Sequence, residues 1–82
     1  MDEFEPVTVD THQLGRMRVI TSAREAAEML ANNWHWERGH AYRLAVQACM
    51  DQIEGKADPA TVRGRFAAAA KKAGIFVREG RP

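Results

Sequence analysis

The residues with the clearest potential for chemistry are one cysteine, Cys49, and two histidines, His35 and His40. Together they would supply only part of a metal site, because structural zinc needs four ligands, usually in closely spaced pairs. A catalytic pair of Cys49 with either histidine is the other option, since a thiol nucleophile needs a neighbouring base. We predict no metal, no cofactor and no catalytic residue, and keep a minor enzyme or ligand-binding site near these three residues as an alternative.

Cys49 itself fits a structural position better than a catalytic one. It falls on the apolar stripe of a predicted helix, in step with Tyr42, Val46 and Ile53. A free cysteine on such a face behaves as a small buried hydrophobe, and no activating cation or helix N-terminus is predicted beside it. The sequence also lacks a glycine-rich phosphate loop, a nucleophile elbow and an HExxH motif.

A short segment, residues 34–39, carries both tryptophans. Trp34 follows Leu30 at helical spacing, which predicts that it closes the core between the first two helices. Trp36 has no such periodic partner, and an exposed aromatic side chain beside polar groups often anchors a partner or stacks on a ligand. The predicted contact residues for a partner or ligand are His35, Trp36, Arg38 and His40.

The C-terminal third of the chain carries most of the positive charge. Residues 55–82 hold seven Arg/Lys and two Asp/Glu, whereas residues 1–54 hold five and nine. Such asymmetry is one mark of a nucleic-acid-binding face. However, Arg63 and Arg65 lie about 200° apart on a helix, and no aromatic residues interleave with the cations to stack on bases. We predict a solvated face, and keep nucleic-acid binding as a less favoured alternative, with candidates Arg63, Arg65, Lys71 and Lys72.

Three short runs have the composition of β-strands. Residues 6–9 and 16–20 predict a hairpin with a loop of about four to six residues. The second run alternates charged and apolar residues, which predicts that Met17 and Val19 face the core and the two arginines face solvent. Residues 75–77 predict a last strand.

Three helices are predicted between these strands from their start and stop signals. A capping box at Ser22–Glu25 begins the first, and Gly55 follows the second. Asp58 caps the third, which ends at Gly74. Gly64 inside it costs about 1 kcal/mol relative to alanine, which predicts a close helix crossing at that point. The predicted ranges are 23–33, 40–53 and 59–73.

The element order β-β-α-α-α-β predicts an α+β fold, a small three-stranded antiparallel sheet with the helices packed on one face. The last strand joins the hairpin, because a lone strand leaves its backbone groups unsatisfied. The length suits a single domain, residues 1–82, with flexible tails at 1–5 and 79–82. Exposed sheet edges must be covered, charged or paired, so we consider a homo-oligomer formed through one edge.

The compartment is inferred from what the sequence lacks. One cysteine gives no internal disulfide framework, which favours a reducing compartment. The acidic start, residues 1–6, has neither the basic residues nor the apolar run of a signal peptide. No apolar stretch approaches the ~18 residues of a membrane span. We therefore expect a cytoplasmic protein without membrane contact.

Several fragments, in order and spacing, resemble the family catalogued as domain of unknown function 982, small uncharacterised proteins of rhizobial and related alpha-proteobacteria. The fragments are residues 6–9, 19–27, 39–49 and 66–75, together with Trp34. Trp36 departs from the resemblance, because a loop residue such as proline is expected nearby. The resemblance implies a single-domain bacterial protein and brings no assigned activity, so no catalytic residue is carried over. We predict a small non-enzymatic binding or regulatory module, whose partner the sequence does not identify.

Overall fold

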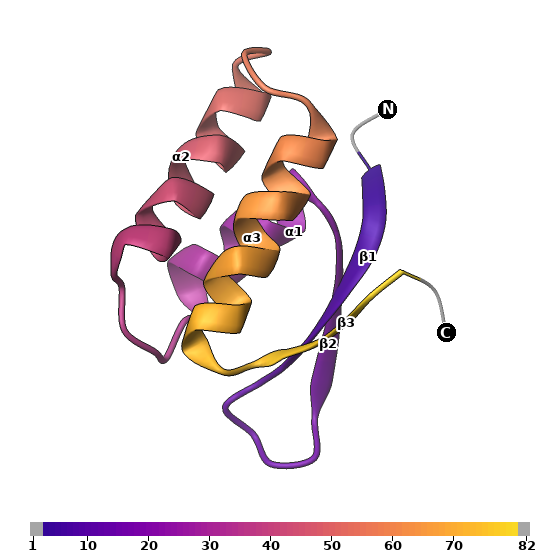
Figure 1. Cartoon of the computed structure of the whole chain (residues 1–82), viewed down its shortest axis with the longest axis vertical. Coiled ribbons are helices and arrows are strands. Elements are labelled where there is room, and N and C mark those ends of the chain that lie inside the picture. Colours follow the sequence, from indigo (N-terminus) through magenta and orange to yellow (C-terminus); the bar gives the residue numbers. More distant parts are fainter. Residues whose placement is uncertain (1–2, 81–82) are drawn as a thin grey trace.

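A computed structural model, which describes residues 3–80, confirms the predicted α+β fold (Figure 1). The central strand β1 pairs antiparallel with β2 on one side and β3 on the other. α1 and α3 pack on the same face of this sheet, and α2 packs against α3 and α1 (Figure 1). The elements are β1 (Glu3–Asp10), β2 (Met17–Ser22), α1 (Ala23–Asn32), α2 (His40–Ile53), α3 (Pro59–Ala73) and β3 (Phe76–Glu79).

The strands are longer at the chain ends than the sequence indicated. β1 already begins at Glu3, and β3 continues to Glu79, so residues 3–5 and Glu79 belong to strands, while the predicted flexibility of the tails 1–5 and 79–82 stays a prediction. Glu3 pairs with Ser22 across an irregularity that spans Pro6, a residue with no backbone N–H to donate. The carbonyl of Pro6 accepts a hydrogen bond from the Gly80 N–H at 2.8 Å. Residues 1–2 and 81–82 lie outside the described residues.

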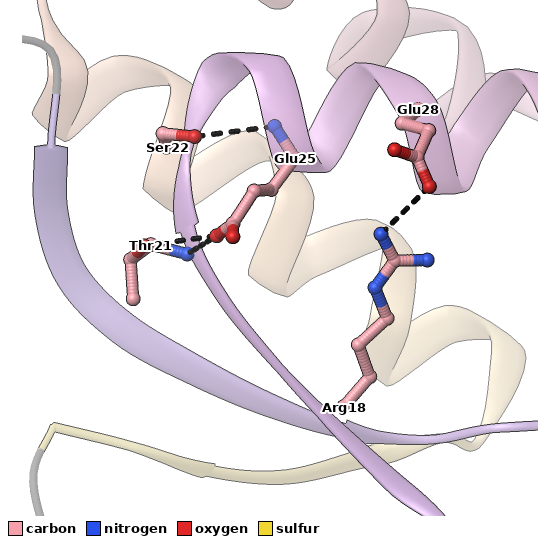
Figure 2. Close-up of polar contacts among 5 residues, drawn as sticks. All are labelled: Arg18, Thr21, Ser22, Glu25 and Glu28. Carbon is pink, nitrogen blue, oxygen red and sulfur yellow. Dashed lines mark hydrogen bonds and ion pairs between the residues drawn. The ribbon is translucent and has the colours of Figure 1, made fainter.

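The buried and exposed faces of β2 are the reverse of those predicted. Met17 and Val19 are 57% and 51% exposed, whereas Ile20 is fully buried. Ile20 points toward the helices, and because side chains alternate along a strand, Arg18 lies on the same inner side. Its guanidinium donates to the Glu28 carboxylate of α1 at 2.9 Å (Figure 2). The apolar Met17 and Val19 therefore belong to the sheet face that the helices leave uncovered.

The start of α1 confirms the predicted capping box (Figure 2). The Ser22 hydroxyl accepts from the Glu25 backbone N–H at 3.2 Å. The Glu25 carboxylate reaches back to accept from the N–H and the hydroxyl of Thr21, at 2.7 and 2.9 Å. An N-cap of this kind stabilises a helix by about 1 kcal/mol, so the cap fixes where β2 ends and α1 begins.

The ends of α3 are also those predicted. The Asp58 carboxylate accepts from the Thr61 N–H and hydroxyl at 2.9 and 2.8 Å, and these hydrogen bonds lower the pKa of Asp58. At the other end Gly74 is left-handed, with φ 77°, and the Ile75 N–H bonds back to the Ala70 carbonyl at 2.9 Å. Ile75 is buried, so this turn directs the chain from the helix into β3.

The second helix, α2, has the predicted bounds, but not all residues of its predicted apolar stripe are buried. Ala45 and Cys49 are buried, whereas Ile53, the last helical residue, is 72% exposed. Ile53 borders a surface depression beside the start of α1 instead of joining the core. Among residues 3–80, no helix combines the length and the apolar character needed to cross a membrane.

Gly64 does not mark a helix crossing, contrary to the prediction. The residue is exposed, and a Cβ atom added to it would meet no heavy atom within 4 Å. Its only conformational effect is therefore the entropic cost of a glycine inside a helix.

We predict that Gly64→Ala raises the free energy of unfolding by about 0.5–1 kcal/mol, the difference in helix propensity between the two residues. Urea denaturation followed by far-UV circular dichroism measures the change. The matched control is Ala68→Gly, an exposed position one turn further along α3, which should lose a similar amount. A destabilising Gly64→Ala would contradict the open surroundings of Gly64.

Candidate functional site

The segment between α1 and α2 is anchored by an aromatic cluster around Trp34. Trp34 is 5% exposed, and its ring centroid lies 5.1 Å from that of Trp36, 5.6 Å from that of Tyr42 and 6.4 Å from that of Phe66. The Trp34 indole N–H donates to the Glu37 carbonyl at 3.3 Å. Tyr42 belongs to α2 and Phe66 to α3, so the predicted role of Trp34 in closing the core is confirmed.

The side chain next to Trp34 reaches the β-hairpin. His35 is exposed, and its ring centroid lies 3.9 Å from that of His12, with the rings tilted by 41°. His12 belongs to the loop between β1 and β2 and was not among the predicted site residues. The sequence offered one signal for it, a histidine in a turn-rich loop that also carries Arg16.

Beside this histidine pair lies a surface cavity of about 300 Å³. We call it the junction cavity, because the hairpin loop, β2 and the end of α1 meet there. Its polar lining is cationic or neutral, and no Asp or Glu is found among the described residues that line it. The lining residues are Thr11, His12, Gln13, Arg16, Met17, Arg18, Met29 and Asn33.

The hairpin loop is held in shape by its own hydrogen bonds. The Thr11 hydroxyl lies 3.2 Å from the carbonyl oxygens of Gln13 and Arg16 and accepts from the Gln13 N–H at 3.2 Å. The backbone N–H of Thr11 donates to the Arg16 carbonyl, and that of Arg16 to the Gln13 carbonyl, both at 3.1 Å. The loop therefore presents His12 and Arg16 from a hydrogen-bonded turn.

The two arginines of the junction cavity differ in their partners. Arg18 is paired with Glu28 on α1, at 2.9 Å, and its side chain is 30% exposed. Arg16 is exposed, and within residues 3–80 no carboxylate lies within ion-pairing distance of it. Arg16 is thus the cation at this site whose charge is least compensated.

The other predicted contact residues lie apart from the junction cavity. Trp36, whose exposure the sequence left open, is half-buried against the core, and its role as a contact residue stays a prediction. The Arg38 guanidinium carbon lies 5.4 Å from the centroid of the Tyr42 ring. His40 is exposed at the start of α2 and borders a different cavity of about 390 Å³, together with Lys72.

The four predicted cations of α3 have different surroundings. Arg63 donates to the Glu79 carboxylate of β3 at 3.0 Å, and the Lys71 ammonium lies 4.7 Å from the centroid of the Phe76 ring. Lys72 borders the cavity at His40, and Arg65 is exposed. Two of the four predicted nucleic-acid contacts are therefore engaged with β3, while nucleic-acid binding itself stays an untested alternative.

Cys49 lies in the core, at 1% exposure, and burial raises the pKa of its thiol to about 11. A thiol in that state is a poor nucleophile at neutral pH, because the thiolate is the reactive form. Within residues 3–80, no three His, Cys, Asp or Glu side chains are grouped so as to hold a metal ion.

We predict that Cys49 of the folded protein reacts with iodoacetamide at pH 8 at least about 100-fold more slowly than in the urea-unfolded chain. A pKa raised by two units from 9.0 to about 11 already lowers the thiolate fraction by about that factor. Mass spectrometry of timed aliquots measures both rates. Equal rates would mean that Cys49 is accessible and that the pKa of its thiol is not raised in the folded protein.

The sheet has two edges, β2 and β3. The edge strand β2 has the exposed Met17 and Val19 on its uncovered face, and β3 is a strand of four residues. An open edge presents unpaired backbone groups to another strand. The pairing of one edge with a second copy of the chain stays a prediction.

Comparison with known proteins places the chain in a family. A sequence model of the family described as "Protein of unknown function (DUF982)" matches residues 5–77. That range contains β1 from residue 5 onward, β2, all three helices and the first residues of β3. Searches among curated proteins and among solved structures found no match.

Proposed function

Because this chain belongs to the DUF982 family, whose function is unknown, we propose a role from the chain's own geometry: a small non-enzymatic binding module. Its site in this proposal is the junction cavity. The observation that carries the proposal is the contact of His12 with His35, at 3.9 Å between ring centroids, beside a cavity of about 300 Å³. The segment after α1 thus contacts the hairpin loop next to a hollow lined with hydrogen-bonding groups.

The composition of the cavity supports binding. Ligand sites are typically concave, with an apolar lining and a few convergent polar groups carried on loops above a rigid scaffold. Met17 and Met29 supply the apolar part of this lining, and the hairpin loop supplies Thr11, His12, Gln13 and Arg16. The scaffold beneath them is the buried side of β1 and β2, where Val9 and Ile20 are fully buried.

The same lining argues against catalysis. It contains no Cys, Ser, Asp or Glu among the described residues, so a nucleophile paired with a base is missing from it. The hydroxyl of Thr11 is engaged with the backbone of its own loop. Cys49, the residue with the greatest intrinsic reactivity, is buried in α2. A module of this kind acts through occupancy of its site, which also suits a regulatory role.

Nuclear magnetic resonance of the ¹⁵N-labelled full chain tests this proposal with a panel of neutral, cationic and anionic fragments. We predict that fragments which bind shift the backbone amides of residues 11–16, Asn33 and His35. His12→Ala should weaken that binding about tenfold, a loss of roughly 1.4 kcal/mol, and His35→Ala, which acts only through its contact with His12, should weaken it less.

His40→Ala is the matched control, because His40 is also exposed but borders the other cavity. It should leave the affinity unchanged. Shifts confined to the surroundings of His40 and Lys72, or no shifts with any fragment, would contradict the proposal.

A further inference from the structure

We infer that the junction cavity binds a small anion, a molecule that carries a carboxylate or phosphate group. This inference rests on the proposed function, since it names the ligand chemistry of the same site. It starts from the imbalance of charge: Arg16 and Arg18 line the cavity, and no Asp or Glu is found among its described lining residues. Glu28 offsets the charge of Arg18, while Arg16 has no carboxylate partner within residues 3–80.

The lining residues also supply the types of hydrogen-bond donor that bind an anion. A guanidinium presents five N–H donors in a planar fork that matches the oxygens of a carboxylate or a phosphate. Gln13 and Asn33, whose side chains are amides, and His12, whose side chain is an imidazole, are among the same lining residues. Hydrogen bonds from a charged donor to a charged acceptor are about twice as strong as neutral ones, so Arg16 should dominate the affinity.

The volume of the cavity and its apolar lining residues further limit the size and chemistry of the ligand. A cavity of about 300 Å³ lies at the small end of ligand pockets, which suits a compact acid. Met17 and Met29 give part of the wall an apolar surface. A short carbon chain with an acidic end would contact both kinds of wall.

Arg18 supports anion binding as a cation that is already held in position. Its pairing with Glu28 orients the guanidinium between β2 and α1, so it is positioned before a ligand arrives (Figure 2). Arg16 is left to make the charged contact with the ligand.

Titrations of the ¹⁵N-labelled full chain with four named compounds test the inference. Succinate and inorganic phosphate are the anions, succinamide is the neutral analogue of succinate, and 1,4-diaminobutane is its cationic counterpart. We predict shifts of the amides of residues 11–16 with at least one anion and weaker or no shifts with the other two compounds. A response to succinate alone identifies the carboxylate as the recognised group, and a response to phosphate alone identifies the phosphate.

Arg16→Gln should weaken anion binding about tenfold, because it removes the charged donor and keeps a polar side chain. Arg16→Lys, which keeps the charge without the planar fork, should lie between this variant and the unmodified protein. The matched control is Arg65→Gln, an exposed arginine on α3 outside the cavity, which should bind as the unmodified protein does. The spectrum of each variant without ligand shows that it is folded.

The outcomes separate this inference from the proposed function. If succinamide or 1,4-diaminobutane shifts the junction amides while neither anion does, the anion inference is overturned and the binding site stands. If anions bind equally well to Arg16→Gln and to the unmodified protein, the role given to Arg16 is wrong. If no compound or fragment affects the junction, both proposals fail.

Discussion

The buried indole of Trp34 is the contact on which the rest of this structure depends. It lies against Tyr42 of α2 and Phe66 of α3, and Tyr42 in turn donates its hydroxyl to the Leu30 carbonyl of α1 at 2.7 Å. One aromatic cluster therefore joins all three helices with the segment that links the first two. Buried aromatic side chains bring large apolar areas and defined ring geometry, which suits them to this task. With Trp34 turned inward, the neighbouring His35 is exposed and meets the hairpin loop.

The hairpin loop is brought beside the end of α1 by the packing of β2, not by the Trp34 cluster. Ile20 is fully buried and sets the inner face of β2, which brings Arg18 toward Glu28 of α1. The strand is thereby joined to the helix both through the capping box at Ser22 and through this ion pair (Figure 2). An exposed ion pair contributes little to stability, about 0–1 kcal/mol, so its main effect here is on orientation. The loop before β2 then lies beside the end of α1, where the junction cavity forms.

Features set by local chemistry were predictable from the sequence, and those set by packing were not. The helix ends at Ser22, Asp58 and Gly74 follow from side-chain caps and a left-handed glycine, which act within a few residues. The facing of β2 was predicted wrongly, because Val19 and Ile20 are adjacent apolar residues and alternation alone does not say which is buried. The contact of His12 with His35 joins two loops through the packing of the whole domain, so spacing along the chain gave no sign of it. The family resemblance is confirmed over residues 5–77, but it named no site.

The central claim is that the hairpin loop and the segment after α1 meet through the rings of His12 and His35. Nuclear Overhauser effects between the imidazole protons of these two residues test it most directly, in the full chain without any ligand. With ring centroids 3.9 Å apart, the account predicts clear cross-peaks between them. Their absence, in a spectrum where the ring protons of Trp34 and Tyr42 do show contacts, would contradict it.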